Sequence, residues 1–332
     1  MPPTAPPPAP PLTPAPPLTP TYPSPIAPLY PPPPQPPPQP PPQQPPPPPP
    51  LINVFPIDIF KTFVPRYGGS INLLGKVNIR LTNTCPFDNL ALGVFTCSKL
   101  IPNFITNLPN IVSTPKLVAF LELVENLNWD KVKEFWIQEF MGSNIKIVGR
   151  TISLWGSENF IFSQYLNEFQ SYNILQVCSL NCALNSFHLR ENSSSIFILK
   201  NRQNNIEILQ SFTGPCPNCH VLINTLIVFK NNPNFIIVEP ANHLNVLRFN
   251  DLPKEQVIDG KRFKLLCGTV REDENHFVAV FNFGIANYYV NAIGKQCELM
   301  PLYNEAFLRR RLLTQLERPY SLAISSALYY LI

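Results

Sequence analysis

The first fifty residues of this 332-residue chain contain 30 of its 43 prolines and no charged side chain. Proline fixes φ and has no backbone N–H, so such a segment can build neither a helix nor a sheet ladder. We expect residues 1–50 to form a disordered, extended polyproline II arm. The arm is either a passive spacer or a ligand for SH3- or WW-type modules, which bind proline-rich chains in aromatic grooves.

The composition becomes globular at Leu51, and residues 51–332 are enough to bury a sizeable core. A net charge of +4 gives no nucleic-acid footprint, and no apolar run reaches the ~18 residues that a membrane span needs. The apolar stretch 320–332 is too short to span, and we expect it to pack on the domain. The start of the chain has no signal-peptide pattern, so an intracellular protein, nuclear or cytoplasmic, is expected.

Helical patterns dominate the first half of the globular part. Apolar residues recur at three- and four-residue spacing over 116–140, which predicts one or two amphipathic helices, and again over 157–169. After about Ile174 the pattern changes to short β-type runs separated by Asn, Gly and Pro, which predicts an antiparallel sheet. A helical half followed by a sheet half indicates an α+β fold.

Cys85 stands where a predicted strand meets a predicted helix. An alternating segment over 77–82 leads to it, and a helical pattern follows at once. Thr84 or Asn83 can act as N-cap, and Pro86 suits the first helical turn. The positive end of a helix dipole lowers the pKa of a thiol, which is how a nucleophilic cysteine is built. The alternative is a small buried apolar residue at a helix start.

His276 and Asn291 have the positions that a partner of this cysteine needs. His276 opens a strand pattern after a polar turn, and Asn291 lies at the end of the next strand pattern. If the two strands form a hairpin, both residues lie on the same side. An asparagine can accept from the second imidazole nitrogen, so Cys85, His276 and Asn291 are a candidate thiol-protease triad. The alternative for His276 is a strand-edge histidine bonded to solvent.

Eight cysteines in a chain without a secretory signal point to metal binding or catalysis more than to disulfides. Cys216 and Cys219 form a CxxC knuckle after a Gly-Pro turn, and Cys178 and Cys182 form a looser CxxxC pair. Together they predict one structural zinc site that joins two β-hairpins. Free thiols, or a site that has lost its metal, are the alternatives, and His220 is a possible substitute ligand.

The order of these features resembles the ubiquitin-specific protease family of deubiquitinases over about residues 70–300. Residues 83–85, Asn-Thr-Cys, match the end of the family's Gly-Asn-Thr-Cys box. Residues 275–279, Asn-His-Phe-Val-Ala, look like its Gly-His-Tyr-x-Ala box, and residues 288–291, Tyr-Tyr-Val-Asn, look like its terminal aromatic box. Each box is short, so the inference rests on their order and spacing.

Several family positions are changed in this chain. Thr82 and Asn275 replace the glycines before the cysteine and histidine boxes, and Ala292 replaces an aspartate of the terminal box. The family's oxyanion asparagine, five positions before the nucleophile, is Arg80. Asp88 stands where most members carry asparagine, which makes the cysteine box similar to that of the divergent SUMO isopeptidase branch.

The resemblance implies a papain-like cysteine protease fold with a helical thumb, an antiparallel β palm and zinc-bearing fingers. It also implies a cysteine isopeptidase acting on ubiquitin or a SUMO-like modifier, in which Cys85 attacks, His276 carries the proton and Asn291 orients the imidazole. The Cys85 backbone N–H, with Asn83 or Asn78, would stabilise the oxyanion. The changed positions leave two alternatives open: a catalytically inactive modifier-binding module of the same fold, and a zinc-stapled protein unrelated to modifiers.

Overall fold

The computed structural model describes residues 55–73, 76–177, 188–194, 197–202, 205–209, 224–240, 249–271, 276–284, 286–300 and 323–332. The proline-rich arm 1–50 lies outside these ranges. So do all four predicted zinc ligands, Cys178, Cys182, Cys216 and Cys219. The fold described below is therefore that of the globular part alone.

The globular part begins with a short helix and a small sheet. Helix α1 (Ile57–Thr62) precedes the hairpin of β1 (Gly69–Leu73) and β2 (Lys76–Thr82). With β3 (Ile147–Val148) and β4 (Thr151–Ser153) this hairpin forms a four-stranded sheet in the order β1-β2-β4-β3. The predicted extended segment before Cys85 is confirmed as β2.

The helical layer contains α2 (Cys85–Leu100), α3 (Thr114–Glu125), α4 (Trp129–Trp136) with a π turn (Ile137–Met141), and α5 (Glu158–Ile161). The pattern over 116–140 is confirmed as two helices. The pattern over 157–169 is not one helix, because α5 is a single turn followed by a 3₁₀ stretch, Ser163–Gln170. Where α5 ends, the Trp136 indole N–H donates to the Ile161 carbonyl at 3.0 Å. This carbonyl would otherwise accept a backbone N–H one turn later if the α-helix continued.

The large sheet has nine described strands, in the order β15-β14-β13-β12-β16-β10-β7-β8, with β11 paired to β12. Their bounds are β7 Phe197–Arg202, β8 Asn205–Leu209, β10 Phe235–Pro240, β11 Glu255–Ile258, β12 Lys261–Arg271, β13 Phe277–Asn282, β14 Asn287–Asn291, β15 Gln296–Met300 and β16 Ala323–Leu331. A three-stranded sheet, β6-β5-β9, contains β5 (Tyr172–Val177), β6 (His188–Ser194) and β9 (Asn224–Phe229).

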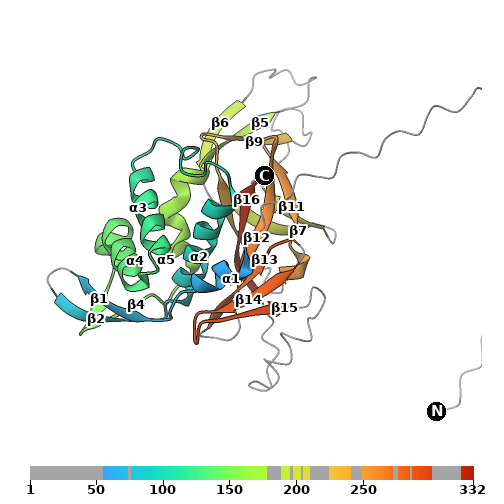
Figure 1. Ribbon diagram of the computed structural model, residues 1–332. Coiled ribbons are helices and arrows are strands. Elements are labelled where there is room, and N and C mark those ends of the chain that lie inside the picture. The colour runs from blue at the N-terminus through green and yellow to red at the C-terminus, as the bar shows by residue number, and fades with distance from the viewer. Residues whose placement is uncertain are drawn as a thin grey trace, which may run out of the picture. The chain divides into compact units, whose positions relative to one another are not determined.

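Two expectations about the sheet need correction. It is not wholly antiparallel, because β10 and β7 pair in parallel. The apolar stretch near the C-terminus does more than pack on the domain, because β16 lies inside the large sheet between β12 and β10. Its apolar run is typical of a strand covered on both faces. The α+β class itself is confirmed (Figure 1).

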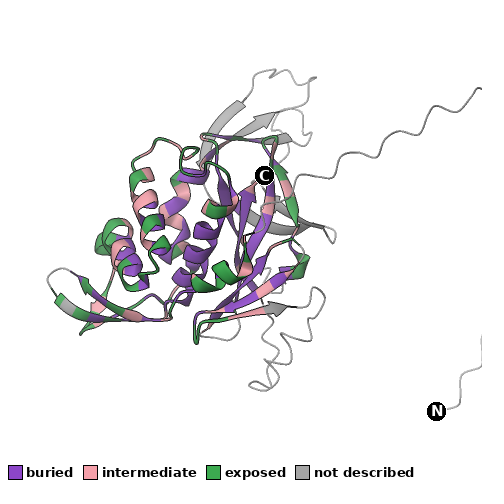
Figure 2. Ribbon diagram, in the orientation of Figure 1, coloured by how far each residue is buried: buried purple, intermediate pink, exposed green. Residues whose placement is uncertain are grey.

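Helix α2 is the centre of the helical layer, and every residue from Cys85 to Cys97 is buried (Figure 2). One side lies against β12, β13 and β16, and the other lies against α3 and α5. Where α2 crosses β12, a Cβ on Gly93 would lie 2.9 Å from Cys267 Sγ, so glycine is what permits this approach. A helix buried on all sides is fixed by packing more than by its own propensity.

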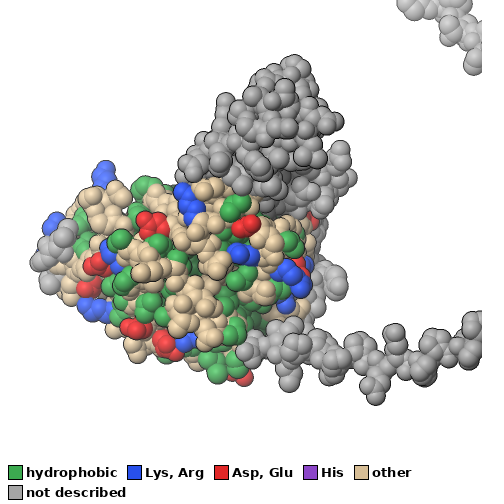
Figure 3. Space-filling model, turned by 90° about the horizontal axis from the view of Figure 1, so that it is seen from above, with side chains coloured by type: hydrophobic (Ala, Val, Ile, Leu, Met, Phe, Trp, Pro, Cys, Tyr) green, Lys and Arg blue, Asp and Glu red, His purple; other side chains and the backbone are tan. Residues whose placement is uncertain are grey.

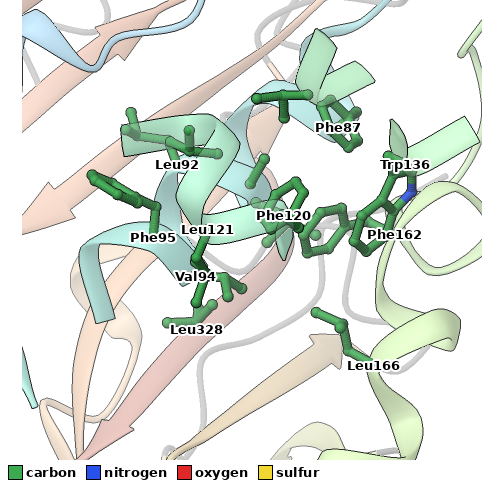
Figure 4. Packing of buried hydrophobic residues seen from close by; sticks show 14 of the residues in the cluster. Phe87, Leu92, Val94, Phe95, Phe120, Leu121, Trp136, Phe162, Leu166 and Leu328 are labelled. Carbon is green, nitrogen blue, oxygen red and sulfur yellow. The ribbon is translucent and has the colours of Figure 1, made fainter. Parts of the chain in front are cut away.

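An aromatic cluster holds the first turn of α2 against the other helices (Figure 4). The Phe87 ring lies 5.6 Å from that of Trp136 and 5.7 Å from that of Phe162, and the last two rings stack at 4.3 Å. Such pairs each add about 0.5–1.5 kcal/mol beyond the area they bury. The start of the helix, two residues before Phe87, is therefore rigidly placed.

On the face seen in Figure 3, Lys and Arg side chains are interspersed with Asp and Glu, and no single sign gathers into a patch. Among the described residues, no helix combines the length and the apolar character needed to cross a bilayer.

Candidate active site

Cys85 is the first residue of α2, just past the end of β2 at Thr82. Between them Asn83 has a φ of 54°, in the left-handed region, and turns the chain from the strand into the helix. Thr84 occupies the N-cap position, as predicted, but its hydroxyl caps no helical N–H. That hydroxyl donates instead to the Asp88 carboxylate at 2.5 Å. Cys85 is thus placed by a strand-to-helix turn in which the Thr84 hydroxyl is hydrogen-bonded to a buried carboxylate.

His276 reaches Cys85 from the large sheet. It directly precedes β13, which pairs with β12, and α2 packs against both strands. Cys85 Sγ and His276 Nδ1 lie 3.5 Å apart, although the residues are separated by 191 positions in sequence. The distance suits proton transfer in a site without substrate, where such contacts are longer than in a complex.

Asn291 ends β14, which forms a hairpin with β13 and so lies beside His276. Its Oδ1 is 3.1 Å from His276 Nε2 and also accepts the Ile293 N–H at 2.9 Å, in an Asx turn. An amide nitrogen could not accept from Ile293, so the carbonyl oxygen must face the imidazole. His276 Nε2 therefore carries the proton, and the unprotonated Nδ1 faces the thiol of Cys85.

Burial raises the pKa of the Cys85 thiol to about 11, whereas its place at a helix N-terminus predicted a lowered pKa. The residue is 2% exposed, so desolvation of a thiolate outweighs the help of the Phe277 and Cys85 backbone N–H groups. The charge of Asp88 raises the pKa further, and that of Lys133 lowers it. With its pKa raised in this way, the Cys85 side chain is a neutral thiol near pH 7.

The two asparagines predicted as oxyanion donors lie in different places. The Asn83 backbone N–H donates to Tyr67 Oη at 3.0 Å, and its Nδ2 donates to Ser153 Oγ at 3.0 Å. Asn78 is an exposed residue of β2, five positions before Asn83, which along a strand is roughly 15 Å. Asn78 is therefore not brought to the site. The Cys85 N–H, at the first position of α2, is the candidate donor nearest the reacting sulfur.

A buried ion pair that was not predicted from the sequence lies near Cys85. Lys133 Nζ is 3.0 Å from Asp88 Oδ1, and both side chains are 0% exposed. The ammonium also donates to the carbonyls of Arg66 (2.6 Å) and Gly68 (2.7 Å), so its three N–H groups face two backbone oxygens and one carboxylate. Burial raises the pKa of Asp88 to about 6, while Lys133 and the Thr84 hydroxyl oppose the rise.

A signal for Lys133 was present in the sequence. It lies four residues after Trp129 and three before Trp136, on the apolar face of α4. A lysine on such a face needs a buried partner of opposite charge. Tyr67 gave no comparable signal, because it lies between elements and all its contacts come from residues distant in sequence.

The predicted zinc site falls outside the described residues, within which no group of three or more His, Cys, Asp or Glu could hold a metal ion. The strands next to the cysteines are described. Val177, the last residue of β5, pairs with Asn224, the first residue of β9. Cys178 follows Val177 directly, and Cys219 precedes Asn224 by five positions. The sheet thus holds side by side Val177, which directly precedes one cysteine pair, and Asn224, which lies five positions after the other.

No protein-family model matches this chain, and no curated protein matches it in sequence. A solved structure described as "Structure of the SAGA Ubp8/Sgf11/Sus1/Sgf73 DUB module" aligns with a TM-score of 0.39 and 10% identity, over 80% of this chain and 67% of that chain. A likeness of that size carries no argument about what this chain does. The features of this chain that bear on its function are the geometry of Cys85, His276 and Asn291 and the sequence boxes around them.

Proposed function

We propose that this chain is a cysteine isopeptidase that removes ubiquitin or a SUMO-like modifier from lysine side chains. The observation that carries the proposal is the relay in which His276 Nδ1 lies 3.5 Å from Cys85 Sγ and Nε2 lies 3.1 Å from Asn291 Oδ1. The tautomer that the Ile293 N–H enforces is the one a general base needs. The resemblance of the surrounding boxes to ubiquitin-specific proteases supports the choice of an isopeptide substrate.

The reaction starts from the neutral thiol. As Cys85 Sγ bonds to the carbonyl carbon of the modifier's C-terminal glycine, its proton passes to His276 Nδ1, and Asn291 holds the imidazolium through Nε2–H. The Cys85 backbone N–H donates to the oxyanion. Collapse breaks the C–N bond, and His276 returns the proton to the leaving lysine amine. Water, deprotonated by His276, then hydrolyses the thioester and restores the thiol.

In this proposal the elements form a papain-like architecture of the ubiquitin-specific protease type. Helices α2–α5 are the thumb, the large sheet is the palm, and β5, β6 and β9 are the base of the fingers. The first domain boundary lies at residue 50, with the catalytic domain over 51–332. Deletion of residues 1–50 should leave the reactivity and the melting temperature of the remainder unchanged, and a loss of more than about 1 kcal/mol would show that the arm docks on it.

We assign a structural zinc ion to the fingers, held by Cys178, Cys182, Cys216 and Cys219. Thiolates suit tetrahedral zinc, and the pairing of β5 with β9 supports the convergence of the two cysteine pairs. Natively purified protein should contain one equivalent of zinc by elemental analysis, and Cys216→Ser should release it. Protein purified without chelators and free of zinc would contradict the assignment.

The proposed activity is tested with ubiquitin and SUMO probes that carry an electrophile at the C-terminus. The wild-type chain should form a covalent adduct with one of them, and Cys85→Ala and His276→Ala should not. Cys297→Ala is the matched control, because Cys297 is also a free thiol and, unlike Cys85, is partly exposed. Adduct formation that survives Cys85→Ala, or no adduct with either probe, would overturn the proposal.

A second candidate is a catalytically silent module that binds the modifier. The burial of Cys85 and the rise of its thiol pKa to about 11 favour this candidate. It predicts that unmodified ubiquitin or SUMO binds to the chain, while neither electrophilic probe forms an adduct. Binding measured by calorimetry on the same preparation separates the two candidates.

A further inference from the structure

The nucleophile and the base of the candidate site come from different layers. Cys85 belongs to a helix, and His276 and Asn291 belong to the sheet. A relative shift of about 1 Å between catalytic groups can cost on the order of 100-fold in rate. The contacts that join the two layers beside the site therefore matter for its chemistry.

One short segment, residues 66–68, touches both halves of the site, and we call it the strap. On the nucleophile side, Tyr67 Oη accepts the Asn83 N–H at 3.0 Å and lies 3.3 Å from Asn83 Oδ1, to which it can donate. On the base side, the Tyr67 N–H donates to the Ala292 carbonyl at 3.3 Å. Tyr67 thus joins a residue two positions before Cys85 to a residue next to Asn291.

The strap is itself held from inside the fold. Lys133 Nζ donates to the Arg66 and Gly68 carbonyls, and the Gly68 N–H donates to Thr84 Oγ1 at 2.8 Å. The Thr84 hydroxyl proton is committed to Asp88, so its oxygen lone pair is free to accept from Gly68. Three of these hydrogen bonds are made by backbone groups of the strap. The fourth, from Thr84 to Asp88, orients the hydroxyl oxygen that accepts from Gly68.

The path of the strap also requires glycine where it enters β1. Gly69 has a φ of 132°, and a Cβ there would lie 2.3 Å from Asp130 Oδ1. The chain therefore passes close to the N-terminal turn of α4, the helix that carries Lys133. This close passage brings both strap carbonyls within reach of one buried ammonium.

We propose that Tyr67 is a positioning residue that sets the alignment of Cys85 with His276, and that the strap anchored by Lys133 fixes Tyr67. Tyr67 acts through Asn83 and Ala292 and takes no part in bond making. Its catalytic meaning rests on the proposed isopeptidase function. The alignment itself is a property of the fold and can be measured without a modifier.

The first variant is Tyr67→Phe, which removes one oxygen and keeps the ring and the backbone bond to Ala292. Its matched control is Tyr165→Phe, because the chemical change is the same and no hydrogen-bond partner of the buried Tyr165 hydroxyl lies among the described residues. With the modifier substrate that reacts, Tyr67→Phe should lower kcat on the order of 10- to 100-fold and leave KM within about 2-fold. Tyr165→Phe should match the wild type in both constants.

A second pair of variants tests the anchoring of the strap. Thr84→Val removes the hydroxyl that receives the Gly68 N–H, and Thr84→Ser keeps a hydroxyl at the same place. Thr84→Val should slow the reaction about 10-fold or more, and Thr84→Ser should restore most of the rate. Equal rates in the two Thr84 variants, or a Tyr67→Phe rate equal to that of the wild type, would overturn the proposal.

The same variants are compared by alkylation of Cys85 with iodoacetamide across pH, followed by peptide mass spectrometry. Tyr67→Phe should slow alkylation and alter its pH profile, because the thiol has lost its alignment with His276 Nδ1, and Tyr165→Phe should do neither. Identical profiles for Tyr67→Phe and the wild type would overturn the alignment role. If neither modifier probe labels the wild type, the isopeptidase function fails, and the alkylation comparison still decides the role of Tyr67.

Discussion

Two carboxylates are fully buried in the helical layer, and they are neutralised in different ways. Asp88 on α2 lies 3.0 Å from the Lys133 ammonium. Glu158 on α5 is near the hydroxyls of Thr269 and Ser326, which lower its pKa in part, but no well-aligned hydrogen bond from the described residues reaches either of its oxygens. Burial raises the pKa of both groups, to about 6 for Asp88.

The surroundings of Glu158 make the difference larger. Glu239 on β10 is also mostly buried, and burial followed by repulsion from Glu158 raises its pKa to about 7. Among the described residues, Asp88 thus faces a cation, whereas Glu158 faces hydroxyl groups and a second carboxylate. The Lys133 ammonium that faces Asp88 also binds the strap beside Cys85. Among the described residues, the carboxylates of Glu158 and Glu239 bind no comparable segment.

The largest effect is expected when the cation is removed. Lys133→Met leaves Asp88 buried without a partner and frees two strap carbonyls, so it should lower the free energy of unfolding by about 3–5 kcal/mol. Lys131→Met is the matched control on the same helix, because its surface pair with Glu134 is worth less than about 1 kcal/mol. Urea unfolding measures both. A Lys133→Met loss no greater than that of the control would remove the distinction between the two carboxylate regions.

A smaller effect of opposite sign is expected at the other region. Glu158→Gln removes a buried carboxyl whose ionisation is opposed by desolvation, so at pH 7.5 it should raise the free energy of unfolding. Glu122→Gln, at an exposed position of α3, should change it by less than about 0.5 kcal/mol. If Glu158→Gln lowers the stability instead, the hydroxyls around Glu158 form a satisfied network, and the contrast with Asp88 is wrong.

The smallest effect concerns pH. A carboxyl whose folded-state pKa is raised binds protons more tightly when folded, so stability is greatest below its ordinary pKa and falls as pH rises to the folded value. For Asp88 this window runs from 3.8 to about 6. The wild type should lose stability as pH rises from 4 to 7, and Glu158→Gln should show a shallower loss.

Glu158→Gln should also change the pKa of Glu239. Without the repulsion from Glu158, the pKa of Glu239 should fall from about 7. A carbon-detected NMR titration of the Glu239 carboxyl follows this change directly. An unchanged Glu239 titration would mean that the two carboxylates do not interact.

The parts of this fold that could be predicted from sequence are those set by local periodicity. The alternation over 77–82 and the helical spacing after Cys85 reflect which faces are buried, so β2 and α2 follow from them. The meeting of Cys85 with His276 was expected from the order of the boxes, and these residues lie 3.5 Å apart at the nearest polar atoms. The same order predicted that Asn291 faces the far imidazole nitrogen.

The features that could not be predicted depend on packing, hydrogen bonding and strand pairing between segments distant in sequence. The thiol pKa of Cys85 was expected to fall because of the helix dipole, but burial between α2 and the sheet dominates and raises it. Thr84 was predicted as an N-cap from its residue type, but its hydroxyl donates to Asp88 and accepts from the Gly68 N–H. The parallel pairing of β7 with β10 depends on the chain's path between them, which periodicity does not encode.

The place of β16 has a consequence for how the site arises during synthesis. Residues 323–331 are translated after every other strand of the large sheet, yet they lie between β12 and β10 and against α2. A nascent chain in which Cys85, His276 and Asn291 have all been translated still lacks β16, one of the strands against which α2 packs. Non-local pairing of this kind is slow, so we expect Cys85 and His276 to reach their final alignment only after β16 has joined the sheet.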